Sequence, residues 1–297
     1  LLKHELEKGS LGLSTGLEYE PAFYSNRDEV IELAKVAAAA QARYMSHIRS
    51  EDINQQEALE EIIQIGKKAQ IPVQISHIKI ALKEHWNTSE GLLAQLQMAR
   101  QEGVNITADV YPYTYWNSTL RVLFPQKDFS SLASAEMATR SLFDPSQSYL
   151  VEYDAVPGYK NKTVTQVAAE RKETPAQTLV KLVQLAEEYE ARHPEQQKGS
   201  EAIAATSMSE TDIENFLRWS HTNVCSDGNA GGHPRGYGAF TRVLGRYVRE
   251  RKIITLENAI YKMTGLAAEH LGLHDRGLIR PGQFADLVLL DPETVQD

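Results

Sequence analysis

The segment RYMSHIRSEDINQQEALEEIIQIGKKAQIPVQISHIKI, residues 43–80, decides the fold of this chain. It begins with the short apolar stretch RYMSHI, continues as an amphipathic helical pattern over residues 54–68, and ends with the β-branched stretch IPVQISHIKI. This strand, helix and strand predict a parallel sheet covered by helices, because two parallel strands need a crossover between them. Each predicted strand carries a histidine toward its carboxyl end, His47 in the first and His77 in the second.

The same alternation runs through most of the 297 residues. Further strands are predicted at LGLSTGL (11–17), VNITADVYPY (104–113), EAIAATSM (201–208) and TNVCSDG (222–228), and helices at 28–41, 89–102, 174–191, 209–219, 239–251 and 256–271. The pattern predicts the α/β class and is typical of a (β/α) barrel. In such barrels the functional side chains lie at the carboxyl ends of the strands.

The alternation is interrupted once and changes near the carboxyl end. Residues 116–173 contain Pro, Ser and Tyr in a stretch longer than most barrel connections, so we interpret them as a lid or an inserted subdomain. The barrel itself is expected to span residues 1–275. GLIRPGQFADLVLLD, residues 277–291, then predicts a turn followed by an apolar strand.

Composition argues against several classes of protein. The chain has 31 basic and 40 acidic residues, a net charge of −9, and no basic stripe interleaved with aromatic residues, so nucleic acid is not an expected partner. No apolar run reaches the roughly 18 residues of a membrane span, so none is expected. The single cysteine, Cys225, leaves no disulfide framework and suits a reducing compartment, so we expect a cytoplasmic protein.

Three potential metal ligands lie at the ends of three predicted strands: His47, His77 and Asp227. Imidazole and carboxylate suit Zn²⁺, Mn²⁺ or Fe²⁺, and a hydrolytic site keeps one position open for a water molecule. Simpler explanations exist, because a strand-end histidine is often a satisfied polar residue and Ser-Asp-Gly is a common turn. The residues alone leave both explanations open.

Six stretches together carry a family resemblance. They are GLSTGLEYEP (12–21), YMSHIRSE (44–51), QISHIK (74–79), ADVYPYT (108–114), CSDG with HPRGYGAFTRVLGRY (225–228 and 233–247), and GLIRPGQFADLVLLDP (277–292). In this order they resemble the amidohydrolase superfamily and, within it, the N-acyl-D-amino-acid deacylase (D-aminoacylase) family. Each stretch alone is weak evidence, but six in the family's order are specific.

The resemblance implies a (β/α)8 TIM-like barrel beside a small β-sandwich, with one or two Zn²⁺ ions, or another divalent metal, at the barrel mouth. By this resemblance His47 and His77 are metal ligands, and Asp227 is the catalytic acid/base that also touches the metal. The implied reaction is hydrolysis of the amide bond of an N-acyl-D-amino acid through a metal-activated water.

A deacylase of this kind must also hold the free carboxylate of its small-molecule substrate. Arg meets a carboxylate with two hydrogen bonds and Lys supplies a point charge. By the resemblance the substrate-binding residues are Lys79, Tyr111, Ser118 and Arg235. Arg49 and Glu51 share the face of His47 if the strand continues to residue 51. We expect them to form an ion pair with each other that stabilises the loop at this end of the barrel or contacts the substrate.

The chain departs from the family pattern at its beginning. It contains no His-x-His pair and no clear match to the residue that bridges the metals. We therefore expect a fragment that starts near the fourth strand, an incomplete barrel that lacks its N-terminal strands, and a remnant of the β-sandwich in residues 276–297. Such a polypeptide is expected to be inactive alone.

Two alternatives to the deacylase remain at this point. One is a cyclic-amide hydrolase of the dihydroorotase or hydantoinase kind, against which Arg235 in HPRGYG argues. The other is a non-catalytic barrel that has lost its metal. Sequence leaves open the choice between D and L substrates, the side-chain and acyl preference, the metal, and the oligomeric state.

Overall fold

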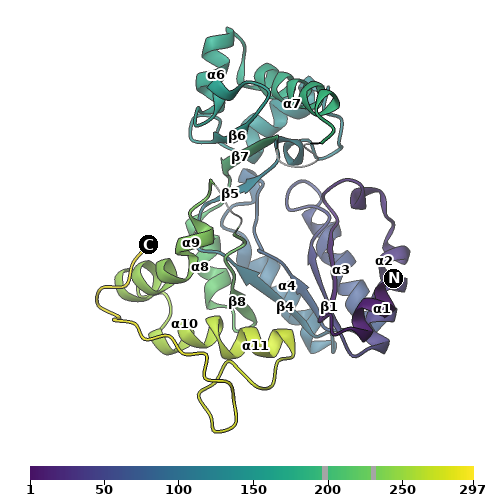
Figure 1. Cartoon of the computed structure of the whole chain (residues 1–297), viewed down its shortest axis with the longest axis vertical. Coiled ribbons are helices and arrows are strands. Elements are labelled where there is room, and N and C mark those ends of the chain that lie inside the picture. The colour runs from purple at the N-terminus through teal and green to yellow at the C-terminus, as the bar shows by residue number, and fades with distance from the viewer. Residues whose placement is uncertain (196–199, 229–231) are drawn as a thin grey trace.

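The centre of the fold is a parallel sheet. Across residues 1–195, 200–228 and 232–297, which a computed structural model of the chain describes, five parallel strands pair in the order β1-β2-β3-β4-β8 (Figure 1). They are β1 (Gly12–Gly16), β2 (Arg43–His47), β3 (Val73–Ile75), β4 (Ile106–Val110) and β8 (Thr222–Val224). Each lies within a stretch that the sequence predicts to be a strand, so the α/β class and the parallel sheet are confirmed.

Helices connect and cover these strands. They are α1 (Leu2–Glu7), α2 (Arg27–Ala39), α3 (Gln55–Ala69), α4 (Ser89–Gln101), α8 (Glu210–Arg218), α9 (Arg235–Arg242), α10 (Leu256–Met263) and α11 (Gly265–Leu271), with short turns η1 (Ala22–Tyr24) and η2 (Lys83–His85) and the π-helix η6 (Val243–Glu250). Helix α3 buries Leu59, Ile62 and Ile65 at helical spacing and exposes Glu60 and Lys67. None of the helices in the described ranges has the length and apolar character that crossing a membrane requires.

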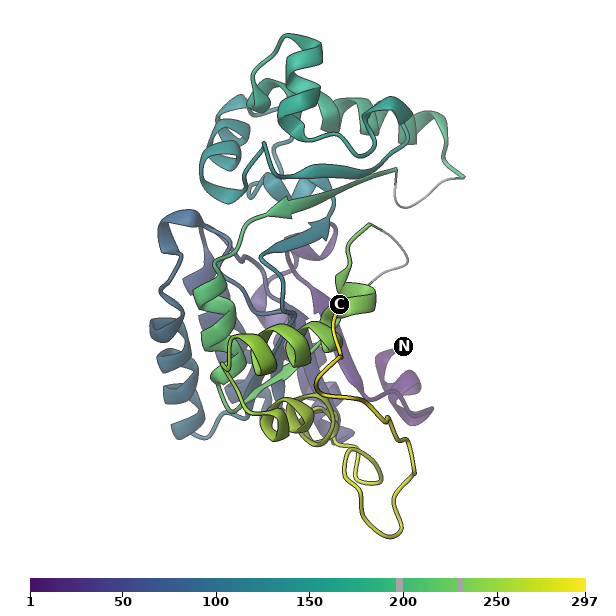
Figure 2. The same cartoon turned by 90° about the vertical axis from the view of Figure 1, so that its left-hand side faces the viewer.

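A second unit stands on the carboxyl end of this sheet (Figures 1 and 2). Its elements are β5 (Tyr115–Ser118), η3 (Leu120–Leu123), α5 (Leu132–Met137), the π-helix η4 (Ala138–Leu142), β6 (Tyr149–Tyr153), η5 (Pro157–Tyr159), α6 (Val164–Arg171), α7 (Pro175–Arg192) and β7 (Glu201–Thr206). Its strands pair antiparallel in the order β5-β7-β6. Leu179, Leu182 and Ile203 lie in a hydrophobic cluster separate from that of the parallel sheet. The predicted strand in residues 201–208 thus belongs to this unit and not to the parallel sheet.

The strand register aligns the carboxyl ends of the parallel strands. Gly16 pairs with His47, Ser46 with Ile75, and Val110 with Val224. Strand β4 pairs directly with β8, although the whole antiparallel unit separates them in the sequence. The residues that follow β2, β3, β4 and β8 therefore lie at one edge of the sheet.

The parallel sheet is open. In the described part of the chain β1 and β8 are its two edge strands, so the five strands do not close on each other. This agrees with an α/β sheet of the barrel type, and closing it requires further strands between β8 and β1.

The strand predicted within residues 277–291 is wrong for this structure, because residues 272–297 form neither helix nor strand. The side chains of Val288 and Leu289 are 88% and 101% exposed. In the described residues no strand lies beside the segment to pair with its backbone N–H and C=O groups, and an unpaired strand is not stable in water. The segment does have the apolar pattern of a strand, but the described elements include no strand that pairs with it.

Candidate active site

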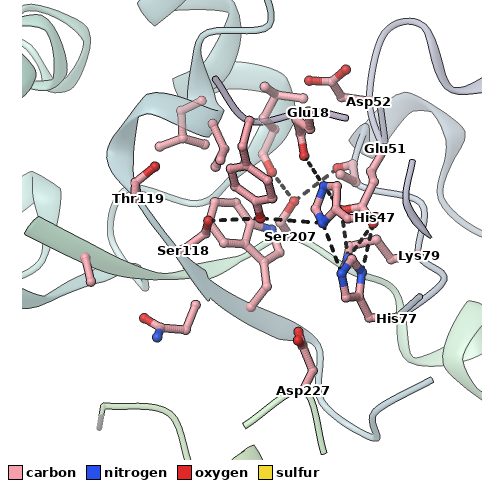
Figure 3. Close-up of a pocket in the computed structure, with 18 of the residues that line it drawn as sticks. Glu18, His47, Glu51, Asp52, His77, Lys79, Ser118, Thr119, Ser207 and Asp227 are labelled. Carbon is pink, nitrogen blue, oxygen red and sulfur yellow. Dashed lines mark hydrogen bonds and ion pairs between the residues drawn. The ribbon is translucent and has the colours of Figure 1, made fainter. Parts of the chain in front are cut away.

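A cavity of about 410 Å³ opens at the carboxyl edge of the parallel sheet, beneath the antiparallel unit (Figure 3). The sequence-predicted site residues all line it: His47, His77, Lys79, Tyr111, Ser118, Asp227 and Arg235. Residues from the antiparallel unit, among them Trp116, Val122 and Leu142, supply apolar wall. The cavity thus combines charged groups from the sheet with apolar groups from the second unit.

His47 and His77 face each other across this cavity. His47 is the last residue of β2, and His77 follows β3 by two residues. The Nδ1 atom of His47 lies 3.0 Å from Nε2 of His77, and the ring centroids are 4.6 Å apart. With Glu51 they form a group whose ligand atoms all lie within 4.8 Å of one another. Two imidazoles and a carboxylate at this spacing are a donor set that suits Zn²⁺.

Glu51 therefore takes a place that the sequence analysis did not give it. Lys79 donates hydrogen bonds to both Glu51 oxygens at 2.7 Å, and Nδ1 of His77 lies 3.1 Å from Oε1 of Glu51. Burial favours the neutral form of this carboxyl group, but the Lys79 ammonium and the two imidazoles outweigh burial and lower the pKa of Glu51. Glu51 is held as a carboxylate beside the two histidines.

The expected pair between Arg49 and Glu51 is wrong. Arg49 instead forms a two-bond ion pair with Glu61 of α3, at 2.8 and 2.9 Å, and donates to the carbonyl of Phe23. Strand β2 ends at His47, so the two-residue alternation does not extend to residues 49 and 51. The chain turns after the strand, which sends Arg49 toward α3 and Glu51 toward the cavity.

Two of the predicted site residues adopt backbone conformations that most residues avoid. His77 has φ +41° and Asp227 has φ +45°. Left-handed backbone in non-glycine residues persists where the surroundings fix it, and it is concentrated at functional sites. The Asp109 carboxylate holds the His77 backbone by accepting its N–H at 2.6 Å.

Asp227 lies in the cavity but is not part of the histidine group. Its Oδ2 atom pairs with Nη1 of Arg235 at 2.7 Å. The expected convergence of His47, His77 and Asp227 on one point is thus only partly seen in the side-chain positions. Glu51, rather than Asp227, is the carboxylate that completes the cluster with the two imidazoles.

Arg235 is the first residue of α9 and is buried. Its guanidinium carbon lies 4.6 Å from the centre of the Tyr111 ring, and Nη2 donates to the Asn117 carbonyl at 3.2 Å. His233 accepts the Arg235 backbone N–H and contacts the Tyr115 carbonyl, so it holds the start of α9 against β5. Among the described residues, buried Arg235 Nε and Asn117 Oδ1 have no hydrogen-bond partner. A buried polar atom without a partner is costly, so both atoms have unused hydrogen-bonding capacity beside the cavity.

Glu18 and Tyr19 are site residues that the sequence analysis did not assign. Oε2 of Glu18 lies 2.5 Å from Nε2 of His47, and Tyr19 Oη contacts both Ser118 Oγ at 3.3 Å and His47 Nδ1 at 3.5 Å. Burial raises the pKa of the Tyr19 phenol, with Glu18 adding to the effect, so Tyr19 stays protonated. The only signal in the sequence was their position in GLSTGLEYEP, the first of the family-like stretches.

Comparison with known proteins gives a consistent picture. The model of the amidohydrolase family matches residues 220–297. N-acyl-D-glutamate deacylase of Alcaligenes xylosoxydans xylosoxydans is 34% identical over 301 residues, covering 100% of this chain and 55% of that protein. D-aminoacylase of the same organism is 32% identical over 302 residues, with 100% and 55% coverage.

A solved structure is similar as well. It is N-acyl-D-glutamate deacylase from Bordetella bronchiseptica, in complex with zinc and a phosphonate inhibitor that mimics the tetrahedral intermediate of the reaction. Its TM-score is 0.83 at 30% identity, and the match covers 100% of this chain and 56% of that one. The chain therefore spans about half the length of the relatives it matches.

Proposed function

Because the chain belongs to the amidohydrolase family, with the N-acyl-D-amino-acid deacylases, we propose that the whole protein hydrolyses the amide bond of N-acyl-D-amino acids. The observation that carries the proposal is Arg235, a buried cation with an unpartnered Nε, in the same cavity as Asp227 and two facing histidines. The cavity thus offers a carboxylate anchor, an acid/base and metal ligands together.

The proposed metal ligands are His47 and His77, and Glu51 and Asp227 are the nearby carboxylates of the cavity. The donor set fits zinc, since imidazole nitrogen and carboxylate oxygen are its usual ligands and two imidazole nitrogens already face each other. When bound, one or two Zn²⁺ ions, or another divalent metal, supply polarisation of the acyl carbonyl and activation of water. Glu18 supports this role by orienting the ring of His47 through Nε2.

Arg235 is proposed to hold the α-carboxylate of the substrate. Its guanidinium is fixed by the Tyr111 ring below it and the Asn117 carbonyl beside it, so the fork is already oriented. Ser118 and Tyr111 complete this wall, and Lys79 adds positive charge from beside Glu51. A fixed anchor places the acyl group at the histidine side of the cavity and lowers the entropic cost of reaching the reactive geometry.

Asp227 is proposed to take a proton from the attacking water and to pass it to the leaving nitrogen. Its present partner is Arg235, and a substrate carboxylate arriving at Arg235 competes for the same guanidinium. The apolar groups of the antiparallel unit, such as Val122 and Leu142, exclude bulk water from the reacting atoms.

The activity, the substrate and the partners are proposed for the whole protein. We further propose that residues 1–275 belong to a closed (β/α)8 barrel, with the unit around residues 116–173 as its lid. The protein is proposed to be cytoplasmic, and the 297 residues alone are proposed to be inactive.

The test is a substrate panel with purified full-length protein loaded with zinc. We expect turnover of N-acetyl-D-amino acids, little turnover of their L enantiomers, and no hydrolysis of dihydroorotate or hydantoins. Hydrolysis of the cyclic amides alone would replace the proposal by the cyclic-amide reaction. Zinc binding without turnover of any of these amides would reject the deacylase.

A further inference from the structure

A second cavity, of about 110 Å³, lies at the opposite end of the parallel sheet from the candidate active site. Arg43 begins β2 and His221 directly precedes β8, so both mark the amino ends of their strands. Arg100 of α4 and His270 of α11 line the same cavity. It shares no residue with the cavity that holds His47 and His77.

Arg43 and Arg100 place two positive charges at this cavity, and among the described residues no carboxylate pairs with either of them. Arg43 donates through Nη1 to the Glu269 carbonyl at 3.4 Å, and Arg100 donates through Nη1 to the Ile106 carbonyl at 2.6 Å. Arg100 Nη1 also donates to Oδ1 of Asn105 at 3.3 Å. In the described parts of the chain neither guanidinium forms an ion pair, and neither Nε nor Nη2 of either residue has an acceptor. Each arginine therefore keeps the two-donor edge that binds oxyanions.

A buried lysine behind the cavity adds a third cation. The Lys262 ammonium is 1% exposed and donates to the carbonyls of Trp219 and Thr222. No carboxylate pairs with it in the ranges that the structure describes. Glu269 is the acid of the cavity wall, and its Oε2 accepts a hydrogen bond from Tyr261 at 3.1 Å. Positive charge thus exceeds negative charge at this end of the sheet.

The pKa values of the two histidines in this cavity reflect the excess of positive charge. Burial, then the charges of His221, Arg100, Arg43 and Lys262, lower the pKa of His270 to about 4. Burial, then Arg100 and Lys262, also lower the pKa of His221, and they outweigh the Glu269 carboxylate, which raises it. Four basic groups therefore act on one ring, which Asn223 holds at 2.7 Å from Nδ1. Buried positive charge is costly unless an anion compensates it.

We propose that this cavity is a binding site for a small oxyanion of the size of phosphate, held by Arg43 and Arg100. Its volume admits an inorganic anion or the terminal group of a phosphate monoester. The site lies at the amino end of the sheet, away from the proposed reaction, where conserved features of barrels serve stability. A ligand that binds only the folded state raises its stability, so the expected role is structural.

The experiment is a calorimetric titration of full-length protein with inorganic phosphate, at constant ionic strength set with sodium chloride. We expect saturable binding at one site, and in NMR an upward shift of the pKa values of His221 and His270 when phosphate is present. Titration with phenyl phosphate distinguishes the two sources: equal affinity indicates a phosphoryl group of an ester, and weaker affinity indicates the free anion.

Two variants locate the site. Arg43→Gln and Arg100→Gln should each weaken phosphate binding at least tenfold, whereas Arg280→Gln, which removes an exposed guanidinium elsewhere, should leave it unchanged. Absence of saturable binding to the wild-type protein overturns the proposal even if a variant fails to fold. Binding that both variants leave intact overturns it as well. So does a side-chain carboxylate of the full-length protein occupying the cavity in a crystal structure.

Discussion

The Nη1 atom of Arg235 lies 2.7 Å from the Oδ2 atom of Asp227, so the proposed carboxylate anchor and the proposed acid/base touch each other. In this arrangement the guanidinium neutralises the aspartate while its own Nε remains without a partner in the described residues. Substrate binding and proton transfer are therefore expected to depend on each other, and substitutions at the two positions should have distinguishable effects.

Asp227→Asn should reduce kcat/KM for the best N-acyl-D-amino acid by about 100-fold or more, because the amide cannot accept the proton from water. The reduction should appear mainly in kcat. Asp154→Asn, in an exposed carboxylate of the antiparallel unit, is the matched control and should be active. Steady-state kinetics on zinc-loaded full-length protein measure this, and a fully active Asp227→Asn enzyme would remove Asp227 from the mechanism.

Arg235→Met should raise KM for N-acyl-D-amino acids about 10- to 100-fold, since a charge-assisted hydrogen bond contributes about 1.5–3 kcal/mol. Hydrolysis of an N-acyl amine that lacks the carboxylate should lose only the part that comes from unpairing Asp227, and so should fall less. Comparison of the two substrates isolates the carboxylate contact from general damage to the site. Arg280→Met, at an exposed position, is the control. An equal loss on both substrates would argue against the anchor.

His77→Ala should weaken zinc binding by more than the roughly 10- to 100-fold that loss of an outer partner costs. His85→Ala, an exposed histidine of η2, should retain the wild-type affinity. Zinc content after dialysis against a graded series of chelator concentrations gives the measurement without an activity assay. Equal zinc content in the two variants would contradict the proposed ligand.

The Arg49–Glu61 pair should contribute to stability, because Glu61 lies largely out of water with 6% of its side chain exposed. Arg49→Ala leaves that carboxylate without its partner, so we expect the free energy of unfolding to fall by about 2–3 kcal/mol. Lys35→Ala breaks the exposed Lys35–Glu32 pair and should cost no more than about 0.5 kcal/mol. Urea denaturation compares them, and equal midpoints would show that the buried pair adds nothing.

Glu201 should make stability depend on pH. Burial raises the pKa of its carboxyl group to about 7, against the lowering effects of the Leu120 N–H and Arg121. The folded state then binds the proton more tightly than the unfolded state, so stability is full below about pH 4.5 and falls as pH rises toward 7. The loss is at most about 3 kcal/mol, at about 1.4 kcal/mol for each pKa unit.

Glu201→Gln should flatten this dependence between pH 5 and 7, while Glu136→Gln, at an exposed position of α5, should leave it as in the wild type. Chemical denaturation at several pH values gives the difference directly. A pH profile that Glu201→Gln does not change would show that other groups cause it.

The parallel sheet was predictable because its signals are local. RYMSH and VQISH combine apolar, β-branched or aromatic residues with a polar end. RYMSH forms β2 throughout, whereas in the second stretch only VQI forms β3 and His77 lies just beyond it. The edge at which His47 and His77 emerge follows from parallel pairing alone. Glu51 was misassigned because its position depends on the turn after β2, and the alternation rule stops where the strand stops.

The antiparallel unit shows that a local sequence pattern does not determine which strand a given strand pairs with, or in which direction. EAIAAT is an apolar run that fits either a parallel strand or an antiparallel one, and its partner β5 lies more than 80 residues earlier. The segment around Leu289 gives the opposite case, since its strand pattern finds no pairing neighbour among the strands of the described ranges. Asn117 of β5 and Tyr19 in the turn after β1 gave no chemical signal, because amide and phenol side chains are common in both strands and turns without any functional role.

The two contacts from His233 and Arg235 to the carbonyls of Tyr115 and Asn117 tie the start of α9 to strand β5. A rotation of the antiparallel unit relative to the parallel sheet would therefore also move Arg235, the proposed carboxylate anchor. Entry of a substrate and binding of its carboxylate would then be coupled. Substitutions far out on the upper unit, which touch nothing in the cavity, would then alter KM through this tether.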